Sequence, residues 1–297
     1  MTCSITLNSD SIGNFYAGDV VTGVVVLDLK NDQKLESIDF KVSGVSKANW
    51  SRSAPTIPYI KIYSEKKKVL SILIPNIFKD SVKNNIMPAG IYTYPFHFAL
   101  PADLPSTFES SIAKVAYYIK IKSKPAFKLR KAVPFTVLGN VNLNHVDEIL
   151  MPTFYDFSKT FRKSGSFRIC FKTYRGFAPR QTIPFEITIV NEKKVKIRKI
   201  IVTLIQKLRY NVQAGYAEEE RKMCHVQHKN FSRNIAELCF FNMEIPQLIP
   251  SSLNTLNPMI DVSYIFRVEV IFPFHMSLQG DIPVTVATTP VIHYEFD

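Results

Sequence analysis

The chain has 297 residues, of which 46% are hydrophobic, and its formal net charge is +12. This length allows one large domain or two ordinary ones, and the hydrophobic fraction is enough for a full core. The longest apolar runs, VVVLDL and VLSILIP, are far shorter than the roughly 20 residues of a membrane-spanning helix. The opening stretch is polar and mixed, so we expect no secretory signal and a soluble, cytosolic protein.

The positive charge is concentrated in the first half of the chain. Up to residue 140 there are 18 Lys and Arg against 10 Asp and Glu, whereas the remainder has 19 against 15. Such an excess favours an anionic partner, which could be a lipid surface, an acidic tail or nucleic acid. The four cysteines show no paired spacing, as expected where thiols stay reduced.

Taken in chain order, the expected elements are short strands in which apolar and polar residues alternate. The clearest alternations lie at residues 35–45, 113–123, 184–192 and 259–270. Period-two alternation is typical of strands with one packed face and one wet face. Residues 215–224, GYAEEERKMC, are the best helix candidate, yet a charged hairpin tip fits them better. The pattern predicts an all-β protein built as a sandwich.

One proline-containing phrase occurs twice. FALPADLPSTFE, Phe98–Glu109, returns as MEIPQLIPSSLN, Met243–Asn254, and three further landmarks recur in the same order. This repetition predicts two copies of one β-sandwich, with domains at 1–141 and 142–297 and the linker within 140–165. The first copy carries extra sequence at about residues 51–85. We expect the first proline of each phrase to end a strand, because proline cannot donate to a strand ladder.

The ordered set of phrases resembles the arrestin-domain-containing proteins, the α-arrestins. The phrases are FYAGDVVTGVVVL, MPAGIYTYPFHFALPADLPSTFE, VAYYIKI, GFAPRQTIPFEITIVN, IPQLIPSSL, IDVSYIFRVEV and IPVTVATTPV. The resemblance implies two tandem arrestin-type, immunoglobulin-like β-sandwich domains. It also implies a non-enzymatic cytosolic adaptor at the plasma membrane and endosomes. Such an adaptor binds cytosolic segments of membrane receptors or transporters and directs their ubiquitination, endocytosis or endosomal sorting.

The chain departs from the family pattern in three respects. It contains no Pro-Pro-x-Tyr motif, so the resemblance implies at most indirect contact with a HECT-type ubiquitin ligase. Thioredoxin binding in one relative depends on a Cys where this chain has Asn257-Pro258-Met259, so that activity is not carried over. The sequence also gives no position for the buried Asp/Arg cluster that acts as a switch in the classical receptor arrestins. The alternatives are a retromer-like trafficking scaffold and a lipid-binding arrestin-fold module without ligase recruitment.

A dense run of basic residues, KIKSKPAFKLRKAV, is the candidate binding site. It could bind anionic lipid head groups or an acidic cargo segment, and the competing interpretation is an ordinary solvated face. Alternation places Lys120 and Lys122 on the same outer face of a strand. A nucleic-acid site needs aromatic stacking platforms, and Phe127 alone is too little. The candidate residues are Lys120, Lys122, Lys124, Lys128, Arg130 and Lys131.

The sequence offers no clear catalytic or metal motif. It contains no nucleophile elbow, P-loop or dinucleotide fingerprint, so we expect no enzyme activity and no cofactor. The segment CHVQH supplies Cys224, His225 and His228, with Cys239 further along. Zinc needs four convergent ligands, and this spacing is weak. A polar loop with incidental residues is the preferred interpretation, and a metal-dependent or thiol enzyme is the alternative.

Overall fold

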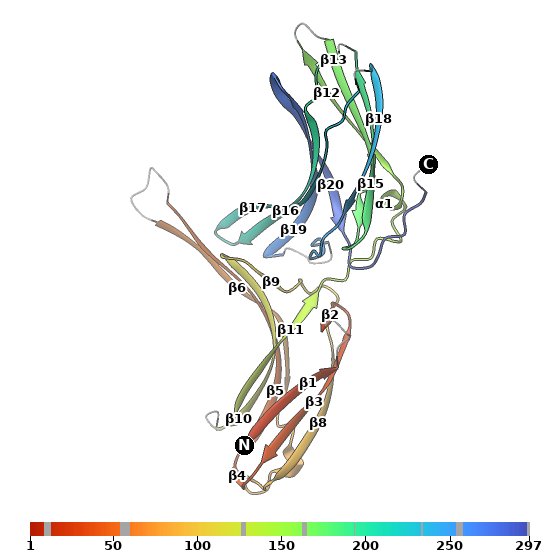
Figure 1. Cartoon of the computed structure of the whole chain (residues 1–297). Helices are drawn as coiled ribbons and strands as arrows, with labels where there is room; N and C mark the ends of the chain where they lie inside the picture. The colour runs from red at the N-terminus through yellow and green to blue at the C-terminus, as the bar shows by residue number, and fades with distance from the viewer. Residues whose placement is uncertain are drawn as a thin grey trace. The chain divides into compact units, whose positions relative to one another are not determined.

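The computed structural model describes residues 1–8, 13–53, 60–125, 129–161, 165–192, 194–232, 234–253 and 258–295. Nearly all of its regular structure is β-strand (Figure 1). The chain divides into two compact units. Unit 1 comprises Met1–Gly139, Tyr210–Tyr216 and Asn254–Ile260, and unit 2 comprises Asn140–Arg209, Ala217–Leu253 and Asp261–Asp297.

Unit 1 contains a three-stranded sheet and a six-stranded sheet. The first has the order β1-β3-β8, and the second has the order β2-β11-β10-β5-β6 with β9 beside β10. A small ribbon pairs β4 with β7, and one turn of 3-10 helix, η1, follows β6. The bounds are β1 Thr2–Asn8, β2 Asn14–Tyr16, β3 Val20–Leu29, β4 Gln33–Lys34, β5 Ser37–Ser53, β6 Ile60–Ile74, η1 Lys79–Ser81, β7 Ile86–Met87, β8 Gly90–Ala99, β9 Phe108–Glu109, β10 Ala113–Lys124 and β11 Arg130–Leu138.

The core of unit 1 follows from strand alternation. In β3 every second residue from Val21 to Leu29 is buried, and in β10 the same holds from Ala113 to Ser123. Aromatic rings fill the space between the sheets, with the rings of Phe40 and Phe96 at a centroid distance of 4.8 Å. Burial of such side chains is the main term that stabilises a sandwich of this kind.

Unit 2 is built on the same plan. Its four-stranded sheet has the order β12-β13-β15-β18, and its five-stranded sheet has the order β14-β20-β19-β16-β17. One short helix, α1, precedes the first strand. The bounds are α1 Asp147–Leu150, β12 Thr153–Phe161, β13 Gly165–Thr173, β14 Gly176–Phe177, β15 Thr182–Asn191, β16 Lys199–Val212, β17 Gly215–His228, β18 Ala236–Glu244, β19 Ile260–Phe272 and β20 His275–Val286.

The duplication extends to single hydrogen bonds. Each unit has a short strand paired in parallel with its last long strand, β2 with β11 and β14 with β20. The buried Tyr117 hydroxyl donates to the Pro105 carbonyl at 2.6 Å, and the buried Tyr264 hydroxyl donates to the Ile249 carbonyl at 2.7 Å. Both acceptors lie in the repeated phrase. The repetition in the sequence therefore marks two all-β sandwiches, as predicted.

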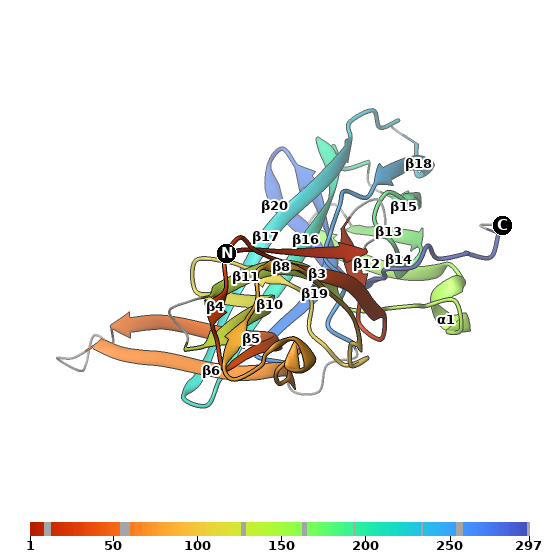
Figure 2. The ribbon, with the colours of Figure 1, turned by 90° about the horizontal axis from the view of Figure 1, so that it is seen from below.

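The repeated prolines act as expected at the strand ends. β8 ends at Ala99, two residues before Pro101, and β18 ends at Glu244, two residues before Pro246. The extra sequence of the first copy includes the far end of the β5–β6 hairpin. Figure 2 shows this end projecting beyond the rest of unit 1.

Two local expectations from the sequence are wrong. The CHVQH segment is strand, not a polar loop, because β17 extends to His228. Residues 215–224 also belong to β17, so the charged segment forms the strand that follows the hairpin tip. β17 is an edge strand, and its inward side chains are only partly covered. They need not be apolar, so the sequence of β17 lacks the apolar and polar alternation by which the other strands were predicted.

Among the residues that the structure describes, no helix is long and apolar enough to cross a membrane.

Candidate functional site

The candidate site is the outer face of the six-stranded sheet of unit 1. In β10, Val115, Tyr117 and Ile119 are buried against the three-stranded sheet. Because successive side chains of a strand point to opposite faces, Lys120 and Lys122 point outward. The period-two pattern of the sequence therefore positions these two lysines correctly.

Neighbouring strands add further cations to this face. Lys41 of β5 lies opposite Lys120, and Lys47 of β5 lies between Lys114 of β10 and Lys66 of β6. Arg130 of β11 lies opposite Lys122. We call this surface the basic face. It comprises Lys41, Lys47, Lys66, Lys68, Lys114, Lys120, Lys122, Lys124 and Arg130.

Few carboxylates neutralise the basic face. Lys114 donates to Glu109 at 2.7 Å. For the other eight cations, no salt bridge forms within the described part of the chain. Asp39 lies opposite Lys122, and its carboxylate accepts the backbone N–H of Asn76 at 3.1 Å. The face therefore carries a large uncompensated positive charge.

The crowding of charge affects Lys120 in particular. Partial burial, followed by repulsion from Lys122 and Lys41, lowers the pKa of the Lys120 ammonium group. The same ammonium group lies 5.2 Å from the centroid of the Tyr118 ring, which is close enough for a cation–π contact. Repulsion among like charges destabilises the folded protein, and an anionic partner would relieve it.

The structure separates the six residues that the sequence grouped together. Lys120, Lys122, Lys124 and Arg130 share the basic face. Lys131 pairs with Ile121 and points to the opposite face, where its charge acts on the Cys3 thiol. Lys128 lies outside the described residues.

Sequence reasoning missed the residues that β5 and β6 contribute. The run from Lys66 to Lys68 is visible in the sequence, but its position beside β10 is not. Alternation would have shown that Lys66 points away from Lys67. It could not have shown that Lys66 lies across from Lys47, because that contact depends on the pairing of β5 with β6.

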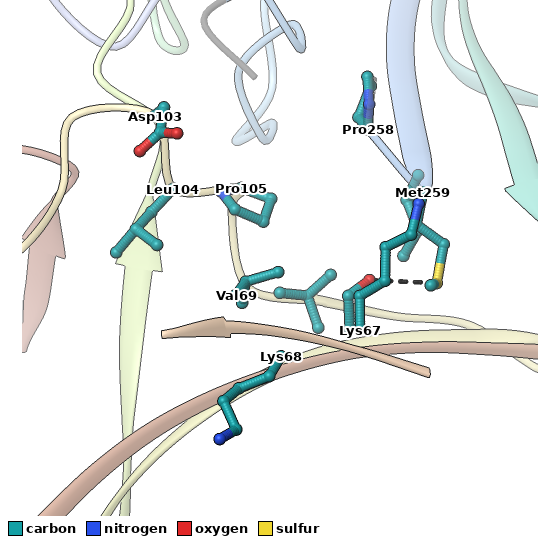
Figure 3. A pocket seen from close by; sticks show the side chains of 11 residues that line it. Lys67, Lys68, Val69, Asp103, Leu104, Pro105, Pro258 and Met259 are labelled. Atoms are coloured by element: carbon teal, nitrogen blue, oxygen red, sulfur yellow. Dashed lines mark hydrogen bonds between the residues drawn. The ribbon is translucent and has the colours of Figure 1, made fainter. Parts of the chain in front are cut away.

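Two hollows open on unit 1. One of about 450 Å³ lies on the basic face and is lined by residues that include Lys47, Lys66 and Lys114. The other, of about 340 Å³, is lined by both apolar and polar residues, which include Leu104, Pro105, Met259 and Asp103 (Figure 3). In Figure 3 the Lys68 side chain points away from this second hollow, which agrees with its outward position on β6.

The cysteine and histidine group does not converge. Cys224, His225 and His228 lie on β17, whereas Cys239 is buried on β18 in the other sheet. Burial raises the pKa of the Cys224 thiol to about 11, which disfavours the thiolate that metals and electrophiles require. Within the described ranges, no group of three or more His, Cys, Asp or Glu could hold a metal ion.

Comparison with protein families agrees with the duplicated sandwich. Residues 3–144 match the arrestin (or S-antigen) N-terminal domain, and residues 173–291 match the arrestin (or S-antigen) C-terminal domain. The fold is therefore that of a two-domain arrestin. The chain belongs to the arrestin family, and its homologues are named arrestin domain-containing proteins.

Three relatives illustrate the similarity. Arrestin domain-containing protein 1 of Homo sapiens is 27% identical over 135 residues, which cover 43% of this chain and 31% of the relative. Arrestin domain-containing protein 17 of Caenorhabditis elegans is 25% identical over 223 residues, 70% of this chain and 52% of the relative. Arrestin domain-containing protein 5 of Bos taurus is 21% identical over 310 aligned positions, 97% of this chain and 91% of the relative. The matched segments span about a third of the human relative and about half of the nematode relative.

Arrestin-family proteins are non-enzymatic adaptors, as the sequence led us to expect for this chain.

Proposed function

We propose that this protein is a cytosolic adaptor that binds cytosolic segments of membrane receptors or transporters. It directs their ubiquitination, endocytosis or endosomal sorting while it is peripherally associated with the plasma membrane and endosomes. The observation that carries this proposal is the presence of both arrestin domains in one chain. The basic face of unit 1 supports it, because a surface of this charge attracts an acidic cargo segment or an anionic membrane.

The route to a ubiquitin ligase is indirect in this proposal. The sequence contains no Pro-Pro-x-Tyr motif, which is the segment that WW domains of HECT-type ligases would bind. In this proposal the ligase reaches the 297-residue chain through a second protein or through a contact other than this motif. If no ligase takes part, the protein acts as a retromer-like scaffold or as a lipid-binding module of the arrestin fold.

Proximity labelling in cells tests the proposal, with the 297-residue chain as bait. We expect enrichment of membrane receptors or transporters, together with a WW-domain ubiquitin ligase. A matched bait with Phe266→Asp, which places a charge in the core of unit 2, controls for labelling that does not depend on the fold. Cargo without a ligase would favour the scaffold alternative. Equal labelling by both baits, or no membrane cargo, would contradict the adaptor proposal.

A further inference from the structure

The basic face continues onto an apolar surface at the far end of the β5–β6 hairpin. Lys66 lies opposite Lys47 on the basic face, and the register stays regular from there to Ile60. Because side chains on one face recur every second residue, Ile62 and Ile60 point to the same side as Lys66. Their side chains are 67% and 65% exposed. One strand therefore carries cations and then exposed isoleucines on a single face.

The charges of this face spread in two dimensions. They lie on four adjacent strands, β11, β10, β5 and β6, which together span about 14 Å at the usual strand spacing. From Lys66 to Ile60 the strand adds about 20 Å along its own direction. A single extended peptide would cover one line of this surface, whereas a bilayer presents anionic head groups across all of it.

We propose that the basic face and the Ile60–Ile62 end of the β5–β6 hairpin form a docking surface for an anionic lipid bilayer. The lysines and Arg130 contact acidic head groups, and the two isoleucines enter the boundary between head groups and acyl chains. Apolar insertion combined with electrostatic attraction is the usual basis of interfacial membrane binding. This inference deepens the proposed function, since it assigns the lipid surface to which the adaptor binds.

An aromatic stack lies on the face of the hairpin opposite to the two isoleucines. The ring of Trp50 stacks on that of Tyr63 at a centroid distance of 5.3 Å and an interplanar angle of 4°. Tyr63 also has the ammonium group of Lys61 5.1 Å from its ring centroid. The stack stiffens the projecting strands from the face behind Ile62, so little conformational entropy is lost when the isoleucines enter the lipid. Tyr118 on the basic face adds an amphipathic ring among the lysines.

Vesicle flotation with the purified 297-residue chain tests the electrostatic part. The vesicles contain phosphatidylcholine alone or phosphatidylcholine with phosphatidylserine. We expect binding to the serine-containing vesicles, and a weakening on the order of a hundredfold in the triple variant Lys66→Glu, Lys68→Glu, Lys122→Glu. The matched control reverses the charge of three exposed lysines that lie outside the basic face, Lys30→Glu, Lys79→Glu and Lys83→Glu. This control should retain most of the binding.

The apolar part has its own variant. Replacement of Ile60 and Ile62 by Ser should weaken binding to the same vesicles about tenfold. The matched control, Ile86→Ser with Ile91→Ser, removes two exposed isoleucines that lie outside the six-stranded sheet and should bind as the wild type does.

Trp50, the only tryptophan of the chain, pairs with Tyr63 and points to the face of the hairpin opposite to the two isoleucines, so this measurement needs a tryptophan at the docking end. Lipids brominated on the acyl chains quench tryptophan only at short range. In an Ile62→Trp, Trp50→Phe variant we expect quenching with brominated serine-containing vesicles, and none with brominated phosphatidylcholine alone. Adding Lys66→Glu, Lys68→Glu and Lys122→Glu to this variant should remove most of the quenching.

Three results would overturn the membrane proposal. They are no preference of the wild type for serine-containing vesicles, equal binding by the triple variant, and vesicle-bound Ile62→Trp, Trp50→Phe protein without tryptophan quenching. A fourth test offers a soluble polyglutamate peptide. If the peptide binds the wild type tightly and depends on the same lysines, while the isoleucines contribute nothing to vesicle binding, the face is a site for acidic peptides instead.

The two proposals can fail separately. If vesicle binding is absent while proximity labelling still enriches membrane cargo, the inference fails and the adaptor function stands. If vesicle binding holds while no cargo is labelled, the lipid surface stands and the adaptor function fails.

Discussion

Single side chains tie each sandwich to its proline-containing crossing. The hydroxyl groups of Tyr117 and Tyr264 are buried, and burial raises the pKa of both phenols well above the usual range. They remain neutral donors to main-chain carbonyls at physiological pH. Tyr264 has an additional partner, because the Gln206 side-chain amide donates to its hydroxyl at 2.7 Å.

Tyr264→Phe is therefore expected to destabilise the protein more than Tyr117→Phe. Loss of the Tyr117 hydroxyl leaves one carbonyl without its donor and should cost about 1 to 2 kcal/mol. Loss of the Tyr264 hydroxyl also deprives a buried amide of its acceptor, so the cost should exceed that value. Urea unfolding of both variants measures this difference. Tyr118→Phe, on the outer face of β10, is the control and should change little. Equal costs for the two buried tyrosines would contradict the argument.

His293 gives unit 2 a pH-dependent contribution to stability. Its ring stacks on Tyr174 at a centroid distance of 3.9 Å, and its Nε2 atom lies 2.6 Å from the Gly176 carbonyl. Burial lowers the pKa of the imidazole below its ordinary value of 6.5. The unfolded chain therefore binds a proton more readily than the folded one. The contribution of His293 is present above the unfolded pKa and is lost as the pH falls below it.

The expected result is a drop in the thermal midpoint from about pH 7.5 to about pH 5.5 that depends on His293. His293→Gln should lower the midpoint at the higher pH and reduce the difference between the two conditions. His225→Gln, at an exposed position of β17, should leave the difference intact. If the His293 variant retained the full pH difference, another group would be responsible.

Among the elements, β5 combines two constraints at neighbouring positions. Gly44 lies at a register irregularity with β6, and a Cβ atom there would lie 2.6 Å from the Tyr117 ring. Ser43 points to the outer face and is buried, and its hydroxyl finds no hydrogen-bond partner among the described residues. Position 44 therefore excludes a side chain larger than that of glycine, whereas Ser43 carries a hydroxyl group that contributes nothing to stability.

Gly44→Ala should consequently destabilise the sandwich by about 1 to 3 kcal/mol, because the added methyl group displaces a buried aromatic ring. Ser43→Ala should be neutral or slightly stabilising, since it removes an unsatisfied buried hydroxyl. Denaturant unfolding of the pair separates the two effects on adjacent residues of one strand. A neutral Gly44→Ala variant would show that the Tyr117 ring moves aside freely.

The limits of sequence reasoning also appear at the scale of elements. Alternation over residues 113–123 predicted which side of β10 each lysine occupies, because a strand's faces follow from local pattern alone. The same rule applied to Arg130 and Lys131 would have placed them on opposite faces. Lys41 and Lys66 could not be joined to the site in this way. The positions of Lys41 beside Lys120 and of Lys66 beside Lys47 depend on the strand order β10-β5-β6, which long-range pairing decides.

For the whole molecule, the net charge of +12 and the local basic face make different contributions to anion binding. Net charge acts from a distance on any anionic surface, whereas a face acts at contact and in one orientation. The two triple variants on unit 1 distinguish these contributions. Each reverses three lysines and lowers the net charge by the same amount, but only one alters the face.

Salt provides the test at this scale. A rise from about 0.1 M to about 1 M shortens the Debye length from about 10 Å to about 3 Å and so weakens electrostatic binding to vesicles. The wild type and the Lys30→Glu, Lys79→Glu, Lys83→Glu variant should lose affinity steeply and in parallel. The Lys66→Glu, Lys68→Glu, Lys122→Glu variant should show a shallower slope, because three of the nine cations of the basic face are replaced by anions. Flotation over a salt series measures the three slopes. If both variants fell equally below the wild type, total charge would govern binding, and the arrangement of lysines on β5, β6 and β10 would not matter.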